Sequence, residues 1–205
     1  MFQNKVAADG STCKYKASLV EKCFSRVQGV DYHETFALVA KMDSICLVLA
    51  ISSSNHWKVH HMDVKSSFLH GDIHEEIYMK QPEGYISDPS LVCKLKNSLY
   101  GLKQAPREWY SKMDAFLLSQ NLQRCKSYTN VYIQNYDSHL IIIVLYADDL
   151  LITGSRVASI STIKIALHNA FEMSDLGLLK QFLGIEFEQI YDGIMITSTN
   201  TYQNY

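Results

Sequence analysis

Three segments of the chain repeat their apolar residues every three or four positions, which is the spacing of an amphipathic helix. The predicted helices cover residues 45–51, 106–122 and 155–171. Asp43 or Ser44 is expected to cap the first helix. Pro106 suits the first turn of the second helix, where its missing N–H costs nothing.

Other segments alternate between apolar and polar residues, or stay apolar, over the shorter lengths typical of strands. A strand is predicted over residues 57–64, and a hairpin over residues 184–197 that turns at Asp192-Gly193. The longest apolar run, residues 140–145, is much too short to cross a bilayer, so no membrane association is expected. Together these segments predict an α+β fold in which helices pack on one face of a mainly antiparallel sheet.

Two adjacent carboxylates, Asp148 and Asp149, interrupt an otherwise apolar stretch of the chain. The sequence around them predicts two buried strands that meet at an acidic turn. Two ionised carboxylates in such a place repel each other and resist the loss of solvent. A divalent cation removes that cost, and hard oxygen ligands favour magnesium or manganese over zinc. For the pair alone, a solvated hairpin turn without a metal is an equally good interpretation.

A third carboxylate, Asp63, lies at the end of the predicted strand 57–64 and precedes a short turn or helix. Only folding can bring it to Asp148 and Asp149, because the three are far apart in the sequence. Three carboxylates around two cations form the arrangement that activates a hydroxyl group and stabilises a leaving pyrophosphate. The spacing by itself leaves this convergence open.

The segment before the second predicted helix combines groups that bind phosphate. Gly101 lets the backbone approach a ligand closely, and Lys103, Gln104 and Arg107 supply two cations and an amide near a helix N-terminus. Residues 94–112 are locally basic, although the whole chain has a net charge of −2. A solvated, basic entry to the helix is the alternative interpretation.

Several histidines lie near Asp63 in the sequence and raise the question of a zinc site: His56, His60, His61, His70 and His74. His56 and His60 have i, i+4 spacing, but they fall in a predicted loop and strand, where that spacing does not align ligands. Solvated or stacking histidines are therefore predicted instead.

The composition is that of an ordinary globular protein: 205 residues, 20% charged and 47% hydrophobic. This length allows one large domain or two small ones. The five cysteines are scattered, form no Cys-x-x-Cys pair and are predicted to be reduced thiols. No signal peptide is recognised at the N-terminus, so a cytoplasmic location is expected.

Six collinear blocks give the sequence a specific resemblance to the reverse transcriptase of copia-type long-terminal-repeat retrotransposons. The blocks extend over nearly the whole chain. They read KYKASLVEKCFS, GVDYHETFALVAKMDSI, HHMDVKSSFLHGDIHEEIYMKQPEGY, VCKLKNSLYGLKQAPREWY, YADDLLITGS and FEMSDLGLLKQFLGIEFE.

The resemblance implies a single reverse transcriptase domain over residues 1–205, with a palm, partial fingers and a largely absent thumb. The fingers-like parts would be residues 1–60 and 72–105. The palm would comprise residues 61–71 and 106–190, and residues 182–205 would form a primer-grip hairpin and a truncated end. Without a thumb, processive synthesis is expected to be weak or absent.

The resemblance also implies roles for individual residues. Asp63, Asp148 and Asp149 would be the catalytic, metal-binding triad for Mg²⁺ or Mn²⁺, with Val64 beside the same metals. Phe68 would lie under the sugar of the incoming nucleotide. The rest of the nucleotide-binding pocket would be Tyr100, Gly101, Lys103, Gln104 and Arg107. The primer grip would be Phe182, Leu183, Gly184, Ile185 and Glu186.

The activity that the resemblance implies is RNA-directed DNA synthesis, by in-line attack of a primer 3′-hydroxyl on the α-phosphate of a deoxynucleoside triphosphate. The implied partners are an RNA or DNA template with an annealed primer, and other regions of a Pol polyprotein. The implied location is cytoplasmic, or within a virus-like particle when the chain is part of an active element.

Departures from the family pattern support an alternative. Ser18 and Cys46 stand where the family usually has arginine, and Cys23 stands where it usually has glycine. Loss of an arginine that grips the triphosphate weakens nucleotide binding by about 1.5–3 kcal/mol. The alternative is a catalytically inactive relic, or a domesticated nucleic-acid-binding module that keeps the fold.

Overall fold

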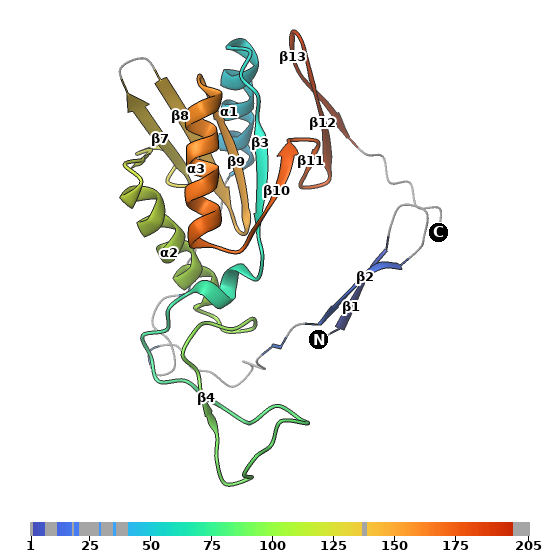
Figure 1. The fold of residues 1–205 in the computed structure, drawn as a ribbon, viewed down its shortest axis with the longest axis vertical. Coiled ribbons are helices and arrows are strands. Elements are labelled where there is room, and N and C mark those ends of the chain that lie inside the picture. Colours follow the sequence, from blue (N-terminus) through green and yellow to red (C-terminus); the bar gives the residue numbers. More distant parts are fainter. Residues whose placement is uncertain are drawn as a thin grey trace. The chain divides into compact units, whose positions relative to one another are not determined.

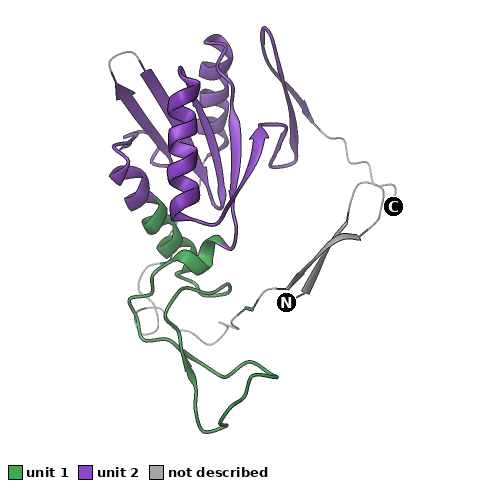
Figure 2. Cartoon of the chain, viewed as in Figure 1, with its two compact units in different colours: residues 1–37, 67–113 green, residues 38–66, 114–205 purple. Residues whose placement is uncertain are grey.

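The computed structural model describes residues 2–6, 12–17, 19–20, 29, 35, 41–136 and 139–198. The chain divides into two compact units (Figure 2). Unit 1 comprises residues 1–37 and 67–113, and unit 2 comprises residues 38–66 and 114–205. Ser18 and Cys23, two of the departures from the family pattern, lie outside the described residues.

Unit 2 is built on an antiparallel sheet in the order β10-β3-β9-β8-β7-β6 (Figure 1). The central strands β8 and β9 are buried along nearly their whole lengths. The edge strand β10 is irregular, with a shift of register between Asp175 and Gly177. The strands are β3 (His60–Val64), β6 (Gln123–Arg124), β7 (Val131–Tyr136), β8 (His139–Tyr146), β9 (Asp149–Gly154) and β10 (Met173–Leu178).

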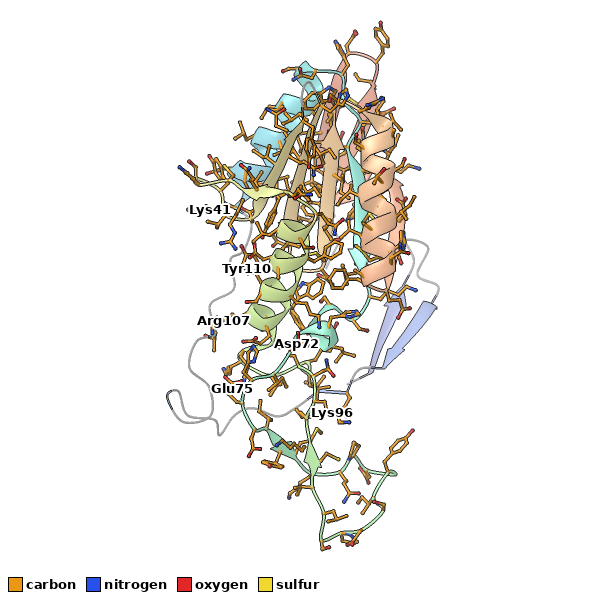
Figure 3. All side chains as sticks on the ribbon, turned by 60° about the vertical axis from the view of Figure 1, so that its left-hand side comes forward. Lys41, Asp72, Glu75, Lys96, Arg107 and Tyr110 are labelled. Atoms are coloured by element: carbon orange, nitrogen blue, oxygen red, sulfur yellow. The ribbon has the colours of Figure 1, made fainter. Side chains whose placement is uncertain are left out.

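Helices cover both faces of this sheet. Ile142, Val144 and Leu151 pack in one core with α1 (Met42–Ser54). The alternate residues of β8 and β9 point to the opposite face, where α3 (Val157–Ala170) lies (Figures 1 and 3). The prediction of helices on one face only is therefore wrong. The physical reason is that β8 and β9 are apolar on both faces, so both faces require cover.

A second, smaller sheet follows β10 and completes unit 2. It consists of β11 (Gln181–Phe182), β12 (Ile185–Ile190) and β13 (Gly193–Ser198) in that order. The predicted hairpin is confirmed as β12–β13, but its two turn residues are Tyr191 and Asp192, because Gly193 already pairs with Ile190.

Unit 1 contains short elements and most of one helix. Helix α2 (Ala105–Ser119) begins in unit 1 and ends in unit 2. A small core forms around Ile77, Leu99 and Leu102. The other elements are β1 (Phe2–Val6), β2 (Thr12–Ala17), the 3₁₀ helix η1 (Ser67–His70), β4 (Tyr78–Met79) and β5 (Cys93–Lys94).

The three predicted helices exist, but the predicted cap of the first is wrong. Helix α1 begins after Lys41, and both Asp43 and Ser44 lie within its first turn. The Ser44 hydroxyl donates a hydrogen bond to the Lys41 carbonyl and accepts one from the Asn130 side-chain amide, so it does not cap a backbone N–H of the helix. Pro106 does lie in the first turn of α2, as predicted.

A polar cluster joins three elements on one side of the unit 2 sheet. Lys164 of α3 donates to Nδ1 of His60 in β3 at 3.0 Å and to the Asp175 carboxylate in β10 at 2.9 Å. Burial and the Lys164 charge lower the pKa of His60, against the opposing effect of Asp175. Burial raises the pKa of Asp175, but the hydrogen bonds from Lys164 and the Gly177 N–H outweigh it and lower that pKa.

This cluster predicts a pH-dependent contribution to stability. Because His60 has a lowered pKa in the fold, the unfolded chain takes up the proton first, and the free energy of unfolding falls as pH decreases below about 6.5. The variant His60→Asn keeps an acceptor for Lys164 but does not titrate. Chemical denaturation at pH 8, 6.5 and 5 is expected to show that the free energy of unfolding falls less for the variant than for the wild-type chain. Parallel stability curves for the two proteins would contradict this.

Candidate active site

The two adjacent carboxylates lie at the tight turn between the central strands of unit 2. Tyr146 of β8 pairs with Asp149 of β9, which leaves Ala147 and Asp148 as a two-residue turn. Ala147 has a φ of 50°, the left-handed conformation that such hairpin turns require. Asp149 is thus the first residue of a strand, whereas Asp148 is part of the turn itself.

Asp63 lies directly opposite Asp149, because β3 and β9 pair antiparallel with these two residues as register partners. Side chains at such positions have Cβ atoms about 4.5–5.5 Å apart and on the same face of the sheet. The Val64 N–H donates to the Asp148 carbonyl at 2.8 Å, which ties the turn to the end of β3. Folding therefore brings the three distant carboxylate residues to one end of three adjacent strands.

These residues do not form a completed metal centre. In the part of the chain that the structure describes, no three His, Cys, Asp or Glu side chains gather as a metal-binding group. The donor chemistry nevertheless suits a hard divalent cation, because all three residues offer carboxylate oxygens. Asp63, Asp148 and Asp149 are each half-buried, so they remain accessible from solvent.

His61 holds one of these carboxylates. Its Nε2 lies 2.7 Å from Oδ1 of Asp149, and its ring is almost fully buried. An ionised carboxylate can only accept, so Nε2 is the donor. The prediction of solvated or stacking histidines is thus wrong for His61 as far as solvation is concerned, although its ring does contact that of Phe182. His56 and His70 do contact the rings of Tyr191 and Trp109.

The segment predicted to form the primer grip lies next to this site. Phe182 and Ile185 pair across a two-residue turn in which Leu183 and Gly184 both have positive φ. Glu186 follows in β12 and is exposed. The buried Phe182 ring meets His61 edge-on at 5.5 Å and Tyr146 at 5.6 Å.

A cavity of about 540 Å³ opens along the same hairpin, lined by residues 178–181, 186–189 and 197. The lining mixes Lys180 with the acidic side chains of Glu186 and Glu188. None of the three aspartates lines this cavity, so it is distinct from the carboxylate site.

The residues predicted to bind the nucleotide lie in unit 1. The Phe68 and Tyr100 rings contact each other at 5.1 Å, and Gly101 has a φ of 97°. Lys103 is exposed and Arg107 is half-buried near the start of α2 (Figure 3). Gln104 is 1% exposed, and neither atom of its amide has a hydrogen-bond partner among the described residues.

Charged residues surround this part of α2. Burial raises the pKa of Glu108, and the nearby Glu75 and Asp72 act in the same direction, against His74 and Arg107. Asp72, Glu75 and Arg107 are labelled in Figure 3. Asp72 in turn forms an ion pair with Lys112, with 2.9 Å between Oδ1 and Nζ. The predicted basic character is therefore balanced by acidic groups on the neighbouring segment.

Comparison with known families decides the identity of this fold. The family model described as reverse transcriptase (RNA-dependent DNA polymerase) matches residues 1–204. The chain belongs to the reverse transcriptase family.

Pol polyproteins of plant copia-type retrotransposons are among the relatives, which confirms the resemblance found in the sequence. The chain is 44% identical over 189 residues to the Retrovirus-related Pol polyprotein from transposon TNT 1-94 of Nicotiana tabacum. It is 36% identical over 199 residues to the corresponding polyprotein from transposon RE2 of Arabidopsis thaliana. These alignments cover 91% and 96% of this chain but only 14% of each polyprotein. No solved structure matches the chain.

Two further observations concern the helices and the cysteines of the chain. None of the helices in the described part has the length and apolar content needed to traverse a bilayer. Among the described side chains, Cys46, Cys93 and Cys125 form no disulfide. Sequence reasoning missed His61, although its place two residues before Asp63 on the same strand was the signal that both share one face.

The facing carboxylates predict an electrostatic cost in the absence of metal. Like charges directly opposite each other in a sheet are destabilising, so Asp63→Asn is expected to raise Tm by about 1–3 °C in a chelator. The comparison is thermal unfolding in EDTA. Asp192→Asn, in the exposed β12–β13 turn, is the control and is expected to leave Tm unchanged. A lower Tm for Asp63→Asn would show that other contacts of this carboxylate outweigh the repulsion.

Proposed function

We propose that this chain is the RNA-directed DNA polymerase part of a copia-type retrotransposon Pol polyprotein. It transfers a nucleotide from a deoxynucleoside triphosphate to a primer 3′-hydroxyl. The observation that carries the proposal is the opposition of Asp63 and Asp149, with Asp148 in the adjoining turn, in a chain of the reverse transcriptase family.

In this proposal, three carboxylates and one backbone carbonyl bind the metal ions at the primer 3′ end. Asp63, Asp148 and Asp149, with the Val64 carbonyl, would hold two Mg²⁺ or Mn²⁺ ions. When bound, these ions supply Lewis acidity that activates the primer hydroxyl and neutralises the leaving pyrophosphate. The antiparallel ladder fixes Asp63 and Asp149 relative to each other, and the bond from Val64 to Asp148 fixes the turn.

Residues of unit 1 bind the incoming nucleotide in this proposal. Phe68 lies under the sugar and rejects a 2′-hydroxyl, supported in its position by contact with Tyr100. Lys103 and Arg107 bind the triphosphate, and Gly101 allows close backbone approach. Gln104 belongs to the same nucleotide-binding pocket. Its buried side-chain amide supports this assignment, because an amide without partners costs free energy unless a ligand or water completes its hydrogen bonds.

The hairpin of Phe182, Leu183, Gly184, Ile185 and Glu186 holds the primer end. The proposal is supported by the contact of Phe182 with Tyr146, which attaches the hairpin to the strand that leads into the acidic turn. In this assignment, most of the palm (residues 61–71 and 106–190) lies in unit 2, and most of the residues assigned to the fingers (1–60 and 72–105) lie in unit 1. The template–primer duplex and other Pol regions are the partners, in the cytoplasm or a virus-like particle.

A second candidate is a nucleic-acid-binding module without turnover, either a relic or a domesticated domain. The observation that favours it is Cys46, an exposed residue of α1 at a position where the family usually has arginine.

Primer extension distinguishes the two candidates. The 205-residue chain is incubated with an RNA template, a DNA primer, deoxynucleotides and Mg²⁺ or Mn²⁺. Asp148→Asn/Asp149→Asn is expected to reduce incorporation by at least about 100-fold, because it removes two of three ligand carboxylates. Asp192→Asn is the matched control, since it removes a carboxylate from the exposed β12–β13 turn of the same unit.

The polymerase proposal fails when folded wild-type chain incorporates nothing at high nucleotide concentration. Retained binding of the template–primer duplex in that protein, measured by fluorescence anisotropy, would then establish the second candidate.

A further inference from the structure

We propose that His61 is the positioning residue of Asp149, and this inference rests on the proposed metal-dependent function. The Nε2–H of His61 fixes the orientation of the Asp149 carboxylate by binding Oδ1, and leaves Oδ2 for the cation. The hydrogen bond of 2.7 Å between these two side chains is the starting observation.

The register of the sheet explains why these two residues meet. His61 pairs with Leu151, and Asp63 pairs with Asp149, so His61 lies diagonally across the strand pair from Asp149 on the same face. Diagonal neighbours in an antiparallel pair are about 7–8 Å apart at the backbone, which a histidine and an aspartate side chain together can span. The bond is therefore a product of the ladder and does not depend on a mobile loop.

The surroundings of His61 restrict its ring to this orientation. The residue is 8% exposed, and the edge-on contact with Phe182 at 5.5 Å closes one side of the imidazole. Phe182 is itself 4% exposed and touches Tyr146, the register partner of Asp149. A buried donor held on a rigid strand is what a metal-bound carboxylate requires, since such outer contacts orient the ligand and tune its basicity.

A purely structural role is the competing explanation, because a buried hydrogen bond to a charged group also stabilises the fold. The two roles differ in what a substitution changes. A structural role predicts that every variant with a lower Tm, whatever its position, also binds the metal more weakly. A positioning role predicts that metal affinity follows the presence of an N–H donor at the place of Nε2.

The test uses three variants of the full chain and Mn²⁺ as the probe. His61→Leu removes the donor, whereas His61→Gln places an amide N–H near the position of Nε2. Thr153→Val is the matched control on β9: it breaks the buried bonds of the Thr153 hydroxyl to Ser52 and to the Lys58 carbonyl, away from Asp149. Mn²⁺ affinity is measured by electron paramagnetic resonance, and Tm is measured for each protein.

We expect His61→Leu to weaken Mn²⁺ binding by about 10- to 100-fold and His61→Gln to recover most of the affinity. Thr153→Val is expected to lower Tm while its Mn²⁺ affinity stays that of the wild-type chain. Equal Mn²⁺ affinity in His61→Leu and wild-type protein would overturn the positioning role. Equal weakening in His61→Leu and His61→Gln, or a comparable loss in Thr153→Val, would also overturn it.

Failure of the proposed function gives a different result. A folded wild-type chain that does not bind Mn²⁺ contradicts the metal centre itself, and the positioning role with it. Wild-type binding that is unaffected by His61→Leu contradicts only the positioning role.

Discussion

The antiparallel pairing of β3 with β9 is the constraint on which the candidate site depends. It places Asp63 opposite Asp149 and His61 diagonal to the same carboxylate. It also brings the end of β3 against the acidic turn, through the bond from Val64 to Asp148. Each of these relations follows from one register, because side chains in a strand alternate between two faces with a period of two.

The stability of this pairing comes from apolar burial away from the site. Strands β8 and β9 are buried over most of their lengths, and α1 and α3 cover their two faces. Asp149 is the first residue of β9, at the end of these strands, where solvent still reaches it. The repulsion between facing carboxylates is of order 0.2–1 kcal/mol, which is small beside the burial of even one large apolar side chain. A core of this size can therefore maintain an unfavourable arrangement of charges.

Much of the fold could be predicted because the buried apolar residues of the helices recur every three or four positions, as Ile45, Val48 and Leu49 do in α1 and as Ile160, Ile163 and Leu167 do in α3. Element boundaries were less predictable, since tertiary contacts set them. The strand predicted over residues 57–64 begins only at His60: the Trp57 N–H bonds back to the Ser52 carbonyl, and the Val59 N–H bonds the Gln189 side chain. The carboxylates were conspicuous among apolar neighbours, whereas His61 was hidden by four other histidines nearby. The register distinguishes His61 from them, because it places this residue diagonal to Asp149.

The register shift in β10 has a consequence for how this sheet accommodates changes in chain length. The irregularity between Asp175 and Gly177 lies on an edge strand, while the ladder between β3 and β9 runs without interruption. An inserted or deleted residue in β10 can be absorbed as a bulge at the edge. The same change within β3 would rotate Asp63 to the opposite face of the sheet. Insertions and deletions should therefore be tolerated in β10 but not in β3.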